Sequence, residues 1–303
     1  MDRFAEVRAS LLRSKRPTRR GAAATLVALV CALFFAPADA AAAKIYFIEL
    51  HTTRPDGTND FRFSLQRVNP DGTGNETVVP DLGPAPLNNS LAFSGDRLYW
   101  RDYTNQTHAA TTGGTLLGPT PAPDARVAAA LYDRALDSAG VYTYFGRTRS
   151  SGADPPDAIV RTRDGEDETL VPTRQFSPPA SVALDEAAGK IYWAGSWNDL
   201  RSGLVQRADL ADGSNVETLL EGFAQDDYHV DLALDPAGGK LYLGNYSLGK
   251  IQRANLDGTG LEDIVTGATV YSIAFDPTPV PEPATAGLAL GLLATTLLIR
   301  CRT

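Results

Sequence analysis

Between residues 44 and 277, short apolar runs alternate with polar turns, and one such unit returns five times along the chain. The clearest copies are Leu184–Trp193 and Leu234–Leu243, in which two β-prone runs flank a polar turn. Weaker copies lie at 93–100 and 136–142, and a half copy opens the series at 44–47. The marker tyrosines are spaced 53, 43, 50 and 50 residues apart, at Tyr46, Tyr99, Tyr142, Tyr192 and Tyr242. A period of about 40–50 residues built from short strands predicts a β-propeller.

Each unit continues with two further β-prone runs joined by a glycine-containing turn, such as Val205–Ala208 and Glu217–Leu220 around Asp212-Gly213. Asp-Gly between β-prone runs is a strong hairpin signal, because glycine readily takes the positive φ that such turns need. With the two runs of the repeated unit, this makes four strands per period, which is one propeller blade. No period leaves room for a helix of about 10–15 residues, which excludes a parallel βαβ architecture.

The order of the runs predicts how the ring closes. The series begins at a tyrosine run, and it ends at Ser272–Asp276, which matches the run that precedes each tyrosine. The last strand would then complete the first blade and pair the N-terminal and C-terminal strands of the propeller, leaving no exposed sheet edge there. We therefore expect an all-β fold of five four-stranded blades.

The same residues resemble the LDL-receptor class B repeat, whose tetrad is Tyr-Trp-Thr-Asp. The tetrad is matched by Tyr-Trp-Arg-Asp at 99–102 and Tyr-Trp-Ala-Gly at 192–195, and Ile251–Gly260 is similar to the third strand and turn of that family. The resemblance covers residues 44–277 and implies a YWTD-like propeller. Members of that family typically have six blades, so six blades is the alternative to five.

Aspartates recur at the end of the first strand of four units, at Asp137, Asp185, Asp235 and Asp276. A single catalytic site would not need one copy per blade. We therefore expect these carboxylates to accept hydrogen bonds from turns or from neighbouring blades.

The N-terminal 40 residues have the pattern of a secretory signal peptide. A basic stretch ending at Arg20 is followed by the apolar run Ala22–Phe35 and by Ala38-Asp39-Ala40, an A-x-A cleavage site that places the mature start at Ala41. Cleavage would be performed by signal peptidase. A permanent membrane anchor is the alternative, but the apolar run is short for a span of about 20 residues.

The C-terminal segment 279–303 has three parts. Val280-Pro281-Glu282-Pro283 precedes the apolar run Ala284–Ile299, and the basic residues Arg300 and Arg302 follow it. This combination resembles the PEP-CTERM sorting signal of Gram-negative bacteria. The resemblance implies a short membrane helix, transient anchoring in the inner membrane, processing by an exosortase, and delivery to the cell surface or the exopolysaccharide matrix. An ordinary C-terminal anchor is the alternative. The predicted propeller domain is then 41–278.

Charge and cysteine content narrow the function of this domain. The net charge of −8 divides into basic termini and a body of 19 basic and 32 acidic residues. An acidic body argues against nucleic-acid binding, which depends on Lys and Arg neutralising phosphates. Cys31 and Cys301 both lie in the terminal segments, so the body has no disulfide, thiolate nucleophile or cysteine metal site.

Candidate catalytic and metal-binding motifs are scarce. His51, His108 and His229 fall in different units without metal-ligand spacing, and no nucleophile elbow, P-loop or H-E-x-x-H motif occurs. Oxygen ligands for calcium occur at Asn69–Glu76 and Asp164–Glu168, but neither segment has EF-hand spacing. We therefore predict no catalytic residue, metal ligand or cofactor, with calcium as the alternative.

Trp197 lies outside the repeat register, in the segment 196–202, and is the candidate for an exposed contact. Together, these features predict an exported binding or structural module whose partners are exopolysaccharide or envelope proteins. The alternative is an extracellular hydrolase or lactonase that uses carboxylates in the channel and a divalent metal.

Overall fold

The computed structural model describes residues 43–53, 59–87, 89–147, 157–173, 179–197, 202–225 and 230–277. Residues Ala43–Thr278 form one compact unit. The predicted cleavage site (Ala38, Ala40 and Ala41), the predicted sorting motif (Val280, Pro281, Glu282, Pro283, Arg300 and Arg302) and both segments predicted to form terminal helices lie outside the described residues. Within the described ranges, no helix is long and apolar enough to cross a membrane.

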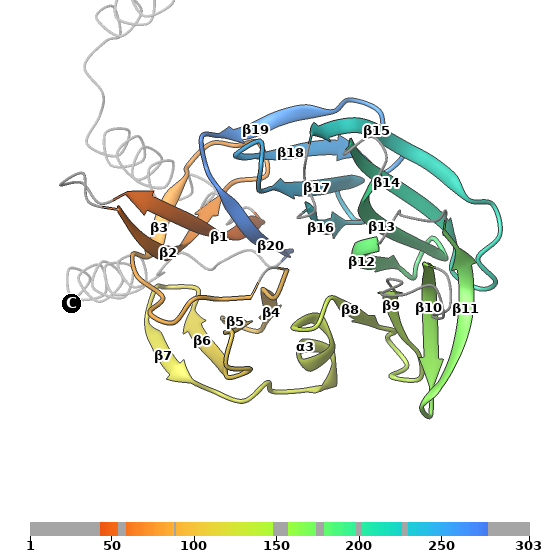
Figure 1. The fold of residues 1–303 in the computed structure, drawn as a ribbon, viewed down its shortest axis with the longest axis horizontal. Coiled ribbons are helices and arrows are strands. Elements are labelled where there is room, and N and C mark those ends of the chain that lie inside the picture. Colours follow the sequence, from red (N-terminus) through yellow and green to blue (C-terminus); the bar gives the residue numbers. More distant parts are fainter. Residues whose placement is uncertain are drawn as a thin grey trace, which may run out of the picture. The chain divides into compact units, whose positions relative to one another are not determined.

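Five antiparallel four-stranded sheets, the blades, surround a central axis (Figure 1). The strands of each blade are given below from the innermost to the outermost. Blade 1 consists of β20 (Val270–Asp276), β1 (Lys44–Thr53), β2 (Asn59–Val68) and β3 (Glu76–Val79). Blade 2 consists of β4 (Ala92–Ser94), β5 (Arg97–Arg101), β6 (Thr107–Thr111) and β7 (Leu116–Pro119). Blade 3 consists of β8 (Arg134–Leu136), β9 (Thr143–Arg147), β10 (Ala158–Arg163) and β11 (Glu166–Pro172).

Blade 4 consists of β12 (Pro179–Asp185), β13 (Lys190–Trp197), β14 (Ser202–Asp209) and β15 (Glu217–Gln225). Blade 5 consists of β16 (Val230–Asp235), β17 (Lys240–Asn245), β18 (Lys250–Asn255) and β19 (Glu262–Thr266). The predicted all-β propeller with five blades is confirmed, and the six-blade alternative is wrong. Closure is also confirmed, because β1 pairs with β20 from Lys44 opposite Asp276 onward.

The strands are apolar on both faces because each blade packs face to face with two neighbours. Ile45, Tyr46, Phe47 and Ile48 are all fully buried. Tyr46 and Ile48 belong to the core shared with blade 2, whereas Ile45 and Phe47 belong to the core shared with blade 5. Alternate residues of one strand therefore join two different junctions, as the period of two requires.

In blades 1, 3, 4 and 5 a buried tyrosine points towards the next blade, opposite an arginine of the third strand. Tyr46, Tyr192 and Tyr242 pair with Arg67, Arg207 and Arg253. In blade 3 the residue in this position is Tyr144, which pairs with Arg161 and is buried. The assignment of Tyr142 as the marker is therefore wrong. Tyr142 precedes β9 and is only half-buried, because the strand register places the second tyrosine of Tyr-Thr-Tyr in the core.

We call the contact made by these arginines the arginine clasp. Each guanidinium binds a glutamate of its own blade and donates through Nη1 to a backbone carbonyl in an outer turn of the next blade. The acceptors, at 2.6–3.1 Å, are Thr112 for Arg67, Ala211 for Arg161, Leu256 for Arg207 and Pro70 for Arg253. The glutamates are Glu76, Glu168, Glu217 and Glu262. Clasps therefore tie blade 1 to 2, 3 to 4, 4 to 5, and 5 to 1.

Glycines in the outer turns close the same four junctions. A Cβ on these glycines would collide with a backbone oxygen of the preceding blade, at Gly72, Gly114, Gly213 and Gly258. Only glycine allows this close approach, and its positive φ suits the turn. Gly165, the turn glycine of blade 3, has no atom within 4 Å of such a Cβ. Blade 3 therefore lacks this contact with blade 2.

The junction between blades 2 and 3 has a different construction. Ala109 pairs with Tyr99, so blade 2 has no arginine in the clasp position. The short helix α3 (Ala125–Ala130), which begins at the cap Asp124, contacts both β4 and β8. Tyr99 and Ala109 pack against Val127 and Leu131 of this helical segment rather than against a strand of blade 3.

The recurring aspartates bind the turns that follow them. Oδ1 of Asp137, Asp185 and Asp235 accepts from the backbone N–H groups of Val141, Ala188 and Gly238 at 2.8–3.0 Å. Asp276 ends β20 and is buried. Asp137, Asp185 and Asp235 therefore hold the turns between the first and second strands of blades 3, 4 and 5, whereas β20 and β1 of blade 1 are not joined by a turn.

We predict that Arg253→Ala lowers the free energy of unfolding by about 1–3 kcal/mol, because the Pro70 carbonyl and Glu262 lose their donor. Arg163→Ala is the control, since the Arg163 side chain is 58% exposed and approaches Asp164 only at 3.5 Å. Denaturant unfolding of both variants measures the difference. Equal losses in the two variants would show that the clasp does not stabilise the ring.

Candidate functional site

Each blade places one polar residue, in its innermost strand or just before it, at the same level of the channel. Counting four residues back from Ser94, Asp137, Asp185, Asp235 and Asp276 gives Ser90, Asp133, Ser181, Asp231 and Ser272. Ser90, Ser181, Asp231 and Ser272 are buried, and Asp133 is partly buried. These five side chains form a polar ring in the described interior.

Asp231 is the hub of the ring. Its Oδ1 accepts from Ser181 Oγ at 2.8 Å and from the Leu232 N–H at 2.9 Å. Its Oδ2 accepts from Ser272 Oγ and from the Ile273 N–H, both at 2.8 Å. Burial raises the pKa of Asp231, and these four hydrogen bonds oppose that shift. The carboxyl group therefore ties blades 4, 5 and 1 together and has few acceptor positions left for a ligand.

Asp133 is held differently. It follows α3 with a left-handed backbone (φ 56°), and its buried Oδ1 has no hydrogen-bond partner among the described residues. Burial and the charge of Asp231 raise the pKa of Asp133 to about 9, although Arg101 opposes the shift. At neutral pH this carboxyl group is protonated, so it can both donate and accept a hydrogen bond.

Asn89 crosses the channel. Its Nδ2 donates to the Ala180 carbonyl of blade 4 at 3.1 Å, and its N–H donates to the Tyr271 carbonyl of blade 1 at 3.2 Å. The residue is 9% exposed and left-handed (φ 50°), and its Oδ1 has no partner within the described part of the chain. A buried acceptor without a donor is unfavourable, so this atom is available for a ligand.

Arg101 lies beside these groups. Its guanidinium carbon is 3.5 Å from the centre of the Tyr132 ring, which is a cation–π geometry. Its Nε is buried and has no hydrogen-bond acceptor in the described ranges. Tyr132 is 52% exposed, so the stacked pair reaches solvent.

Further tyrosines gather at the same end of the channel, where the innermost strands begin. Tyr271 packs edge-on against Phe63 and Tyr246, with ring centres 4.9 and 5.6 Å away. The hydroxyl groups of Tyr271 and Tyr103 are 3.3 Å apart, and Tyr103 is 60% exposed. We call the whole set the channel mouth, consisting of Asn89, Arg101, Tyr103, Tyr132, Asp133, Tyr246 and Tyr271.

The histidines are not brought together. His51 Nε2 lies 2.7 Å from Ser64 Oγ in blade 1. His108 stacks on Trp100 in blade 2, and its Nε2 lies 2.8 Å from Asp102, whose pKa hydrogen bonds hold at about 2 despite burial. His229 lies outside the described residues. In the described part of the chain, no three His, Cys, Asp or Glu side chains are placed to hold a metal ion.

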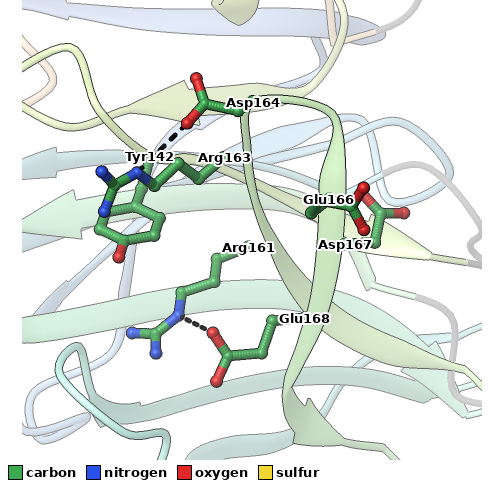
Figure 2. Close-up of a pocket in the computed structure, with 7 residues that line it drawn as sticks. All are labelled: Tyr142, Arg161, Arg163, Asp164, Glu166, Asp167 and Glu168. Carbon is green, nitrogen blue, oxygen red and sulfur yellow. Dashed lines mark hydrogen bonds and ion pairs between the residues drawn. The ribbon is translucent and has the colours of Figure 1, made fainter.

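The two segments considered for calcium form hairpin tips. Asp71 Oδ1 accepts from the N–H and hydroxyl groups of Thr73, at 2.9 and 2.7 Å. The second segment borders a hollow of about 350 Å³ on blade 3, where Arg161 and Arg163 lie beside Tyr142 (Figure 2). Arg161 is bound to Glu168, and Arg163 lies 3.5 Å from Asp164. Both arginines of this hollow are therefore paired within the hairpin.

Trp197 is not in a loop. It is the last residue of β13 and pairs with Ser202 at the start of β14, because that hairpin continues further than the repeat pattern indicated. Its side chain is outside the described part of the structure.

Sequence reasoning missed the channel mouth. A signal was present only for Asp133, since a Ser or Asp stands four residues before the end of the first strand in every unit. Arg101 and Tyr132 have no such signal, because they meet only when α3 brings the third unit beside the second.

No protein-family model matches the chain. Its fold is similar to a chain in the crystal structure of a nidogen/laminin complex, at 13% identity and a TM-score of 0.40, over 78% of this chain and 100% of that one. A putative TolB from Agrobacterium tumefaciens matches at 13% identity and 0.38, over 79% and 98%. A functionally unknown protein from Desulfotomaculum acetoxidans matches at 11% and 0.43, over 76% and 89%. At this level of identity and superposition, the similarities carry no information about ligand or activity.

Proposed function

We propose that this chain is an exported, non-catalytic β-propeller that binds a carbohydrate of the cell surface or matrix through the channel mouth. The observation that carries the proposal is the combination of exposed aromatic rings with buried polar atoms that lack partners. Tyr103 and Tyr132 are 60% and 52% exposed, while Asn89 Oδ1, Arg101 Nε and Asp133 Oδ1 are buried without hydrogen bonds in the described structure.

Carbohydrates present both kinds of surface to a protein. The C–H face of a sugar ring packs on an aromatic face, and its hydroxyl groups donate and accept hydrogen bonds at the edge. Aromatic residues with a polar tip suit such half-wet contacts, since they supply rigid apolar area without leaving buried polar groups. A small number of placed polar atoms then fixes orientation. Envelope proteins are the other partner class, and their binding instead of a glycan would contradict the proposal.

A hydrolase or lactonase is the second candidate, because Asp133 and Asp231 lie in one channel. Two-carboxylate hydrolysis needs one acid and one carboxylate free to act as base or nucleophile. Asp231 accepts four hydrogen bonds from Ser181, Leu232, Ser272 and Ile273. Of these two carboxyl groups, only Asp133 has an oxygen without a hydrogen-bond partner among the described residues. This supports binding over hydrolysis.

The proposal includes export and sorting. The signal peptide at 1–40 and the PEP-CTERM-like segment at 279–303 support delivery to the surface or exopolysaccharide matrix of a Gram-negative bacterium, with signal peptidase and exosortase as processing partners. The YWTD-like repeat supports kinship with LDL-receptor class B propellers. No nucleic-acid partner is proposed for the acidic body. Calcium is not part of the proposed site.

We predict that Tyr103→Ala weakens retention on the producer's own polysaccharide about three- to tenfold, because it removes an exposed stacking surface at the mouth. Val216→Ala is the control, because Val216 is 47% exposed in a turn at the opposite end of the propeller. Affinity electrophoresis measures both. Unretained wild-type protein, or equal retention of the Tyr103 and Val216 variants, would contradict the proposal.

We predict that changing Pro281-Glu282-Pro283 to alanines leaves the full chain unprocessed and membrane-retained in a producer that has an exosortase. The matched control changes Pro277 and Pro279, which flank the motif without belonging to it. Immunoblots of membrane and medium fractions follow processing. Normal processing of the triple variant would refute exosortase recognition of this motif.

A further inference from the structure

The unpartnered polar atoms of the channel mouth belong to segments on both sides of the blade 2–3 junction, Asn89 and Arg101 on blade 2 and Asp133 just before blade 3. Arg101 belongs to blade 2, and its backbone carbonyl accepts from the Leu87 N–H at 2.7 Å, beside the segment that carries Asn89. Its guanidinium reaches across to Tyr132, the residue before Asp133. Asp133 lies close enough to Arg101 and Asp231 for both charges to shift its pKa.

These three groups present a defined hydrogen-bonding pattern. Arg101 Nε can donate, Asn89 Oδ1 can accept, and the Asp133 carboxyl group can do both when protonated. A pair of neighbouring hydroxyl groups, each of which donates and accepts, matches this set. A metal cation does not match it, because Arg101 would repel the ion.

The channel is also blocked behind the site. Asn89 joins blade 2 to blade 4 across the axis, and the hydrogen bonds of Asp231 join blades 4, 5 and 1 at the same level. A polymer therefore cannot thread past this level. Only the end of a chain can reach the three atoms, while the rest of the chain would lie over Tyr103 and Tyr132.

We propose that the non-reducing end of a neutral glycan binds here, its vicinal hydroxyl groups bridging Arg101, Asp133 and Asn89 across the junction between blades 2 and 3. This inference rests on the proposed function and specifies its site and ligand class. A neutral sugar is favoured because the body of the protein carries 32 acidic and 19 basic residues, which repel polyanions.

The site has a structural consequence. Four junctions are tied by an arginine clasp, whereas blade 2 has Ala109 in the clasp position. Phe145 of blade 3, in the position equivalent to buried Trp100 and Trp193, is only half-buried, with the Arg134 guanidinium 4.5 Å above its ring. A ligand bound to residues of both blades would therefore add contacts across the one junction that lacks an arginine clasp.

The test uses an array of neutral and acidic oligosaccharides attached through their reducing ends. The variant is Asp133→Gly, which removes the carboxyl group but suits φ 56°, so the fold is preserved. The matched control is Asp164→Gly, at another left-handed aspartate (φ 54°) in the β10–β11 hairpin. Mild periodate treatment of a duplicate array destroys vicinal diols.

We expect wild-type protein and Asp164→Gly to bind neutral glycans equally, Asp133→Gly to bind about tenfold more weakly, and periodate to abolish binding. If Asp133→Gly binds like wild type while Tyr103→Ala does not, the mouth binds glycans but this inference is wrong. Binding to acidic glycans alone, or binding unaffected by periodate, also overturns it. Absence of any glycan binding overturns both the inference and the proposed function.

Discussion

The guanidinium group of the third-strand arginine holds the ring together at four of its five junctions. In those blades it lies opposite a buried tyrosine, binds a glutamate of its own sheet and donates to a carbonyl of the next blade. The acceptor carbonyls lie in outer turns, so each clasp links the turn of one blade to the third strand of the blade before it by a charge-assisted hydrogen bond. The last of these clasps, from Arg253 to Pro70, joins the end of the propeller to its beginning, as β20 does within blade 1.

The exception explains where the candidate site lies. Between blades 2 and 3 the arginine is replaced by Ala109, the turn glycine Gly165 makes no close contact, and α3 fills the space below Tyr99. The helix also delivers Tyr132 and Asp133 to the channel mouth. A junction closed by a helix instead of a clasp thus carries Tyr132 and Asp133 at its inner end. Binding sites commonly occupy positions where local stability is given up in this way.

Much of the fold could be predicted from sequence because propeller blades repeat locally. The tyrosine period, the Asp-Gly turns and the order of runs at the two ends were sufficient for four-stranded blades and for closure. The prediction of Tyr142 as the marker tyrosine was wrong, because Tyr-Thr-Tyr contains two tyrosines that would face the same side of a strand. Only the pairing with Arg161 identifies Tyr144 as the equivalent residue. The channel mouth could not be predicted, since Arg101 meets Tyr132 only across the ring, after a six-residue helix that has no counterpart in the repeat.

Hydrogen exchange of the free protein, resolved by junction, tests most directly the claim that the ring has one differently closed junction. The account predicts that amides of β7, α3 and β8 exchange faster than those at the four clasped junctions, where the Arg67, Arg161, Arg207 and Arg253 contacts resist opening. Uniform exchange at all five junctions, or fastest exchange at a clasped one, would contradict it.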